Sequence, residues 1–204
     1  MKHIDLVQHR GSAADKSLTP EERNKLLREL KEDKHRIILI LGAYGGLRVN
    51  EICQCRLEWL ERTTLKEKEI LRINIPAECR DARNKLKIWR PKTRKERTTY
   101  LFESNIINEV YFWFKNNPAG IKTSRQAVNK MIAKHFRPII QRDNISPHAL
   151  RATAQNYFRY ERHYSTSFVQ IVLGHKDIRT TEKHYNSLTK ASAESYLMGV
   201  IENE

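Results

Sequence analysis

The segment GGLRVNE, residues 45–51, decides how the first half of the chain is interpreted. Its glycines follow an apolar helix that we expect to stop near Gly42, and Asn50 is a favourable N-cap for the next helix, expected over residues 47–60. Arg48 therefore lies at the entry to a helix, directly after a glycine-rich turn. An arginine in this position can point into a cleft.

The residues before this segment predict a leader followed by one long helix. Residues 1–18 mix glycine, serine, alanine and charge without periodicity, and we interpret them as a leader or a truncated linker. The TPEE sequence at 19–22 has the pattern of a capping box, with Pro20 in the first helical position. A helix from there to the glycines is predicted by an apolar stripe of Leu26, Leu27, Leu30, Ile37, Ile38 and Leu41.

The middle of the chain changes from helical to strand periodicity. Leu71, Ile73 and Ile75 alternate with polar residues, which places them on one face of a strand. We expect a small antiparallel sheet of three strands: EILRINIP at 69–76, KLKIW at 85–89 and RTTYLF at 97–102.

The last part of the chain returns to a helical pattern. Ser146 and Pro147 form an N-cap and first-turn pair, which places His148 and Arg151 one turn apart on one helix face. The fold class is therefore α+β and mainly α-helical, in one domain over residues 19–204. The expected helices cover 104–116, 123–136, 147–163, 166–173 and 180–188, with a tail helix at about 190–202.

Positive charge is concentrated in one stretch of the chain. Lysine and arginine outnumber aspartate and glutamate by 38 to 24, which gives a net charge of +14. Half of this excess lies in residues 80–97, on the expected strands and the turn between them. Such a patch favours a polyanionic partner, and double-stranded DNA is the leading candidate. The predicted DNA-binding residues are Arg80, Arg83, Lys85, Lys87, Arg90, Arg94, Lys95 and Arg97.

Several classes of protein are disfavoured by the sequence. Cys53, Cys55 and Cys79 have the spacing of neither a disulfide framework nor a zinc site, so we expect reduced thiols. The first residues contain no long apolar segment, which argues against a secretory signal or a membrane anchor. We therefore expect a cytoplasmic protein with no membrane partner.

Four segments together carry the residue types of phosphoryl transfer. Cleavage of a phosphodiester without a metal needs cationic donors for the non-bridging oxygens, a nucleophile, a base and an acid for the leaving oxygen. Paired N–H groups of arginine suit the first of these tasks. The segments are GGLRVNE with Arg48, RPKTRKER with Lys92, SPHALR with His148 and Arg151, and LGHKDIRTTEKHY with His175 and Tyr185.

Taken together, these motifs resemble the tyrosine recombinase, or phage integrase, family over about residues 20–190. The resemblance implies a site-specific DNA recombinase, working as a tetramer on two duplexes, without metal, ATP or other cofactor. It implies that Tyr185 attacks the scissile phosphate to give a 3′-phosphotyrosyl linkage and a free 5′-hydroxyl. Arg48 and Arg151 would hold the phosphate, and Glu51 would orient a catalytic arginine or histidine.

The resemblance also assigns proton transfer. Lys92 would protonate the 5′-oxygen, with Lys95, Lys87 and Lys85 as rivals for that role. The two histidines of the motifs, His148 and His175, would bond to the phosphate or assist proton transfer from the tyrosine.

The chain departs from the family pattern in two places. The 44 residues from Arg48 to Lys92 are a long interval, similar to that of archaeal viral or plasmid integrases. Tyr185 lies ten residues after His175, where nine is usual, and His184 occupies the ninth position. One extra residue turns a side chain on a helix by about 100°. Tyr185 therefore needs a looped or kinked segment, or delivery from another protomer, and the sequence leaves both open.

Other functions remain compatible with the same residues. A type IB topoisomerase-like enzyme would nick and reseal one strand with the same chemistry. A catalytically inert DNA-binding protein would keep the fold and the basic patch, and a metal-dependent nuclease would use the histidines as ligands.

Overall fold

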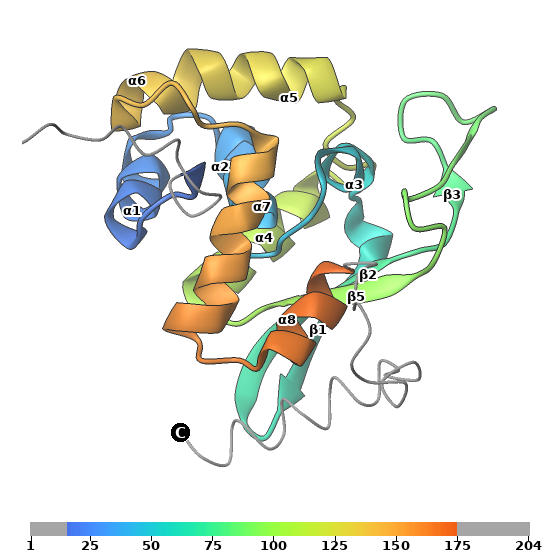
Figure 1. Cartoon of the computed structure of the whole chain (residues 1–204). Coiled ribbons are helices and arrows are strands. Elements are labelled where there is room, and N and C mark those ends of the chain that lie inside the picture. The colour runs from blue at the N-terminus through green and yellow to red at the C-terminus, as the bar shows by residue number, and fades with distance from the viewer. Residues whose placement is uncertain (1–15, 175–204) are drawn as a thin grey trace, which may run out of the picture.

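The structure of the protein, a computed structural model, describes residues 16–174 (Figure 1). It confirms a mainly helical α+β fold with a three-stranded antiparallel sheet. The helices are α1 (Pro20–Glu29), α2 (Asp33–Ala43), α3 (Val49–Gln54), η2 (Leu57–Trp59), α4 (Ser104–Asn116), α5 (Arg125–Met131), η3 (Ile132–Phe136), α6 (Arg137–Ile140), α7 (Pro147–Asn156), η4 (Tyr157–Glu161) and α8 (Thr166–Leu173). The strands are β1 (Leu60–Leu65), β2 (Lys68–Ile75), β3 (Cys79–Arg80), β4 (Ile88–Trp89) and β5 (Arg97–Leu101).

Helix α2 forms the centre of the core. Its residues from Ile37 to Ala43 are all buried, because α7 and α4 pack against it and α1 covers it further. The sheet lies beside this helical body, and α8 packs on β5 (Figure 1). The end of α2 therefore lies between the helical body and the sheet, where the glycine turn leads into α3.

The sheet contains a strand that the sequence analysis missed. Its order is β1-β2-β5, and the expected strand KLKIW is wrong as a member, because only β4 forms there and it pairs with β3 outside the sheet. Strand β1 joins β2 through Lys66 and Glu67, both with positive φ. A two-residue turn of this kind normally contains glycine or asparagine, so its sequence signal was absent.

The expected long N-terminal helix is wrong, because two helices form. The chain leaves helical geometry at Leu30, and α2 begins three residues later. Arg36 donates a hydrogen bond to the carbonyl oxygen of Leu27, which provides a partner for the last turn of α1. No glycine or proline marks this break, so only the tertiary contact identifies it.

The expected helix over residues 47–60 is also shorter than predicted. Its N-cap is Arg48 and not Asn50, and the helix ends at Gln54. The chain after it bonds to a distant loop, since the Leu57 N–H donates to the Pro118 carbonyl at 3.2 Å. These long-range bonds replace helical ones and direct the chain into η2 and β1.

The remaining expectations for the described residues agree with the structure. The helices expected at 104–116 and 166–173 have those bounds, and the two at 123–136 and 147–163 are helical with a π-helical turn in each. The three cysteines are free thiols. Within residues 16–174, no helix is long and apolar enough to cross a membrane. The helices expected at 180–188 and 190–202 and the leader up to residue 15 lie outside the described residues.

Candidate functional site

Arg48 is held at the start of α3 by a reciprocal cap. The Arg48 backbone N–H donates to Oε2 of Glu51 at 2.7 Å, and its Nη1 donates to Oε1 of the same carboxylate at 3.0 Å. Its Nη2 donates to the carbonyl oxygen of Gly174 at 2.7 Å. The Arg48 side chain is 22% exposed, so its guanidinium is fixed in place while part of it still faces solvent.

Glu51 is shared by a second arginine from a different element. Arg97, at the start of β5, donates from Nη2 to Oε2 of Glu51 and from Nη1 to the carbonyl of Val172. Burial alone would raise the pKa of the Glu51 carboxyl, but the charges and hydrogen bonds of Arg97 and Arg48 outweigh it and lower the pKa. Glu51 is therefore an anion near neutral pH.

Arg151 completes the cluster from α7. It donates from Nη1 to the carbonyl of Gly46 and from Nη2 to that of Leu173. Burial, with the nearby charges of Arg97 and Arg48, lowers the pKa of Arg151 to about 9. Arg151 thus stays cationic near neutral pH, but it is destabilised by like charges around it.

The carboxyl end of α8 supplies the acceptors of these guanidinium groups. Carbonyls at a helix C-terminus lack helical partners and carry partial negative charge, so they suit cations. Gly174 ends α8 with φ +61°, and a Cβ there would lie 2.8 Å from Cδ of Arg97. Gly46 has φ +64°, and its Cβ would lie 2.3 Å from Cδ2 of Leu173. Both glycines are needed for the close approach of α8 to the cluster.

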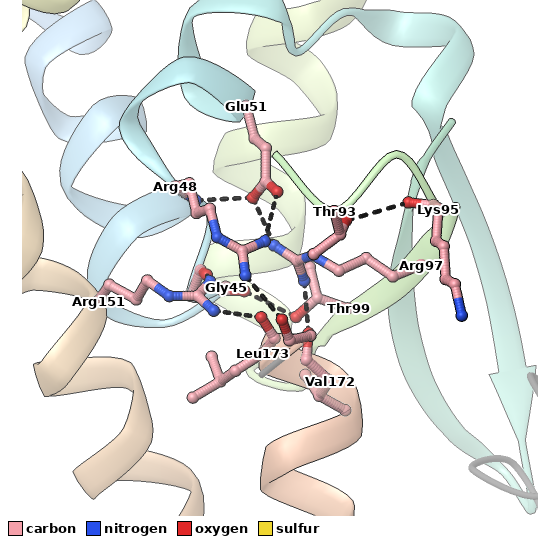
Figure 2. A network of polar contacts seen from close by, with 12 residues as sticks. Gly45, Arg48, Glu51, Thr93, Lys95, Arg97, Thr99, Arg151, Val172 and Leu173 are labelled. Atoms are coloured by element: carbon pink, nitrogen blue, oxygen red, sulfur yellow. Dashed lines mark hydrogen bonds and ion pairs between the residues drawn. The ribbon is translucent and has the colours of Figure 1, made fainter. Parts of the chain in front are cut away.

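The structure therefore brings together three of the predicted site residues, Arg48, Glu51 and Arg151 (Figure 2). Within the described residues, the hydrogen bonds of this cluster do not include Lys92 or His148. Lys92 is exposed on the turn after β4, and His148 is exposed in the first turn of α7, three residues before Arg151. The predicted positions His175 and Tyr185 lie outside the described residues.

Arg97 differs from the role that the sequence analysis gave it. We expected a surface contact with DNA, but its side chain is 7% exposed and bonded to Glu51 (Figure 2). A signal for this was present, because residues 97, 99 and 101 alternate on one face of β5, and Thr99 and Leu101 are buried. On β2, Ile75 of the predicted inward face pairs with Arg97. The alternation thus places Arg97 on the inward face.

The other seven predicted DNA-binding residues are exposed on a projecting segment, residues 76–96, between β2 and β5 (Figure 1). Its base is fixed to α3, since Nε2 of Gln54 donates to Oδ2 of Asp81 at 2.9 Å and its Oε1 accepts from the Ala82 N–H at 2.7 Å. Trp89 packs on Trp59, with ring centroids 5.7 Å apart. The cationic side chains are therefore presented to solvent from an anchored base.

The cluster has the composition of an anion site. Three guanidinium charges against the single carboxylate of Glu51 leave an excess of two positive charges. Guanidinium groups do not bind metal cations, and their fixed forks match the oxygens of a phosphate. The site therefore suits a phosphate oxygen that approaches from the exposed side of Arg48.

Comparison with known proteins gives a sequence match over most of the chain. The model of the phage integrase family matches residues 16–192. The tyrosine recombinase XerA of Pyrococcus horikoshii is 26% identical over 182 residues, which cover 86% of this chain and 58% of XerA. The chain thus spans little more than half the length of this curated relative.

Solved structures share the fold at low sequence identity. The crystal structure of XerA recombinase has a TM-score of 0.56 and 16% identity, covering 92% of this chain and 61% of that one. XerH site-specific recombinase, bound to its difH substrate before cleavage, has a TM-score of 0.58 and 17% identity, covering 92% and 51%. The Tn1549 transposon integrase, in complex with transposon right end DNA, has a TM-score of 0.57 and 17% identity, covering 97% and 68%.

Proposed function

Since this chain belongs to the phage integrase family, we propose that it is a site-specific DNA recombinase that cleaves and rejoins DNA through a 3′-phosphotyrosyl intermediate. The observation that carries the proposal is the convergence of Arg48, Arg97 and Arg151 on the single carboxylate of Glu51. The excess positive charge of this cluster is suited to neutralise the charge that accumulates on a phosphodiester during transfer.

The reaction uses Tyr185 as the nucleophile. Its phenolic oxygen attacks phosphorus, a phosphotyrosyl bond forms, and the bond from phosphorus to the 5′-oxygen breaks with its electron pair on that oxygen. Lys92 gives a proton to the leaving 5′-oxygen, with Lys95, Lys87 and Lys85 as alternatives on the same exposed segment. The step is reversed when the 5′-hydroxyl of a partner strand attacks the linkage, so neither ATP nor a metal is consumed.

The histidines act on the same phosphate in this proposal. His148 shares a helix face with Arg151, and its exposed ring is accessible to DNA. His175 directly follows Gly174, whose carbonyl accepts a bond from Arg48. Either imidazole can bond to a phosphate oxygen or take the proton of Tyr185, because its charge changes near neutral pH.

Double-stranded DNA is the proposed substrate, bound by the exposed cations of residues 76–96. The solved structures of XerH and the Tn1549 integrase contain DNA, which supports this choice. Recombination of two duplexes calls for a tetramer on DNA, in the cytoplasm of a host cell. The long segment between Arg48 and Lys92 is the basis for proposing an archaeal viral or plasmid origin.

The tyrosine chemistry is tested with a nicked suicide DNA substrate in EDTA. We expect a protein–DNA adduct that survives SDS for the wild-type chain and none for Tyr185→Phe, because phenylalanine lacks the attacking oxygen. The adduct is measured by denaturing gel electrophoresis with labelled DNA.

Matched tyrosine variants decide whether Tyr185 is the nucleophile. Tyr160→Phe, at an exposed position of η4, should form adduct as the wild-type chain does. An adduct that persists in Tyr185→Phe would transfer the role to another tyrosine. Cleavage that requires added metal and leaves no adduct would favour the nuclease, and synapsis of two duplexes on a native gel distinguishes a recombinase from a topoisomerase-like enzyme.

Lys85 and Lys87 should contribute to the salt dependence of DNA binding. For the double variant Lys85→Gln, Lys87→Gln, we expect the slope of log K against log salt to become shallower by about 0.9 for each phosphate that the protein no longer neutralises. The control, Lys31→Gln with Lys115→Gln, makes the same charge change at exposed positions of α4 and the α1–α2 connection. Equal slopes for the two double variants in a gel-shift titration would remove the segment from the DNA interface.

A further inference from the structure

A pair of histidines lies where the first turn of α2 meets η3. The rings of His35 and His135 have centroids 4.5 Å apart and an interplanar angle of 41°. Oε2 of Glu32 lies 3.2 Å from Nε2 of His35. One possible ligand atom from each of these three residues lies within 4.8 Å of the other two. Two imidazoles and a carboxylate thus meet from segments that are far apart in the sequence.

We propose that Glu32, His35 and His135 bind a divalent transition-metal ion, of which Zn²⁺ is the representative case. Two histidines and one carboxylate are a common ligand set for such ions, and a water completes the tetrahedron. Ligand atoms at zinc distances lie about 3.4 Å apart, so the side chains need to close by about 1 Å. The ion would replace the proton between His35 and Glu32.

The local backbone supports this ligand set. Glu32 is the N-cap residue of α2, yet its carboxylate makes no capping hydrogen bond, so coordination would not cost the helix a cap. His135 lies in η3, a π-helical turn, which shifts side chains relative to an α-helical path. Single π-helical turns occur frequently at functional sites, because they aim side chains that an α-helix would direct elsewhere.

Exposure and charge at the site set its expected strength. The His35 side chain is 13% exposed, whereas Glu32 is 64% exposed and leaves an entry path from solvent. Imidazole has an ordinary pKa of about 6.5, so both rings are available as neutral ligands near pH 7.5. The charge of Lys34 acts on His35 and opposes a dication. We therefore expect weaker binding than at a closed four-ligand zinc site.

A bound ion would join two parts of the helical body away from the arginine cluster. The ligands hold the first turn of α2, while the last turn of α2 leads into the glycine turn before Arg48. Metal binding would stabilise α2 against η3 by mass action. It would not supply the chemistry of DNA cleavage, so this inference is independent of the proposed function, whose adduct forms in EDTA.

The site is tested on tag-free protein by thermal unfolding with added ZnCl₂ near pH 7.5. We expect the Tm of the wild-type chain to rise by roughly 5–10 °C when free Zn²⁺ is about 100-fold above its Kd. The variants His135→Gln and Glu32→Gln should bind Zn²⁺ at least about 10-fold more weakly, the lower range of loss seen when even an outer partner of a ligand is removed. The matched control is His163→Asn, an exposed histidine without a proposed role, which should keep the wild-type response.

Cobalt spectroscopy identifies the ligands directly. Co²⁺ in the wild-type chain should give the visible bands of a tetrahedral site with nitrogen and oxygen ligands, without a thiolate charge-transfer band. His35→Gln should lose these bands, and, if this change at a mostly buried side chain weakens folding, Glu32→Gln decides the question, since its position is exposed. A wild-type chain without a saturable shift, thiolate bands, or variants that respond as the wild type does would overturn the proposal.

Discussion

Glu51→Gln is expected to lower the free energy of unfolding by about 3–5 kcal/mol, the cost of removing one partner from a buried ion pair. Glu51 is fully buried, and it is the carboxylate between Arg48 and Arg97. Its loss leaves buried guanidinium groups that repel each other without a counter-charge. Because natural domains are stable by only about 5–15 kcal/mol, chemical denaturation should show a large change in midpoint.

The pH dependence of stability gives this prediction a sign. The pKa of folded Glu51 is lowered, so its stabilising contribution is complete above its unfolded pKa of about 4.3 and is lost as the pH falls through the folded value. The stabilities of the wild type and Glu51→Gln should therefore converge in acid. The control Glu58→Gln removes an exposed carboxylate 3.6 Å from Arg56, and its effect should stay within about 1 kcal/mol. A constant difference down to pH 3 would contradict the ionic explanation.

Arg48→Ala should abolish DNA cleavage with little loss of DNA binding. We expect the rate of adduct formation to fall by at least about 100–1,000-fold, the usual effect of removing one donor to transition-state charge. The Arg48 guanidinium is the partly exposed one of the cluster, while the cations of residues 76–96 present a separate surface to DNA. Adduct formation under single-turnover conditions and gel-shift affinity measure the two properties separately.

Arg151 requires a gentler change because it is buried. Arg151→Ala would leave the carbonyls of Gly46 and Leu173 without its bonds, so Arg151→Lys, which retains the charge, is the better variant. It should slow cleavage at unchanged DNA affinity, and the exposed Arg28→Ala serves as the control for loss of a cation. DNA affinity that falls in parallel with cleavage would mean that the cluster binds DNA without a specific part in its cleavage.

Local signals predicted most of the helices well. Ser146 caps α7 and Pro147 occupies its first turn, as their preferences indicate. Thr19 and Glu22 form the expected capping box of α1. Signals failed where the decisive contact was distant in the sequence. The break after Leu30 depends on Arg36, and the turn at Lys66 and Glu67 adopts positive φ without glycine.

The sequence by itself determined the fold class, the family and the order of the motifs that carry Arg48, Glu51 and Arg151, because helix caps, apolar periodicity and local motifs are short-range properties. Only the tertiary structure decided that Arg97 lies inside with Glu51, and that His35 and His135 face each other. Both facts depend on how strands and helices pack across long stretches of chain. A side chain's charge is set by its sequence, but the partner of that charge is set by packing.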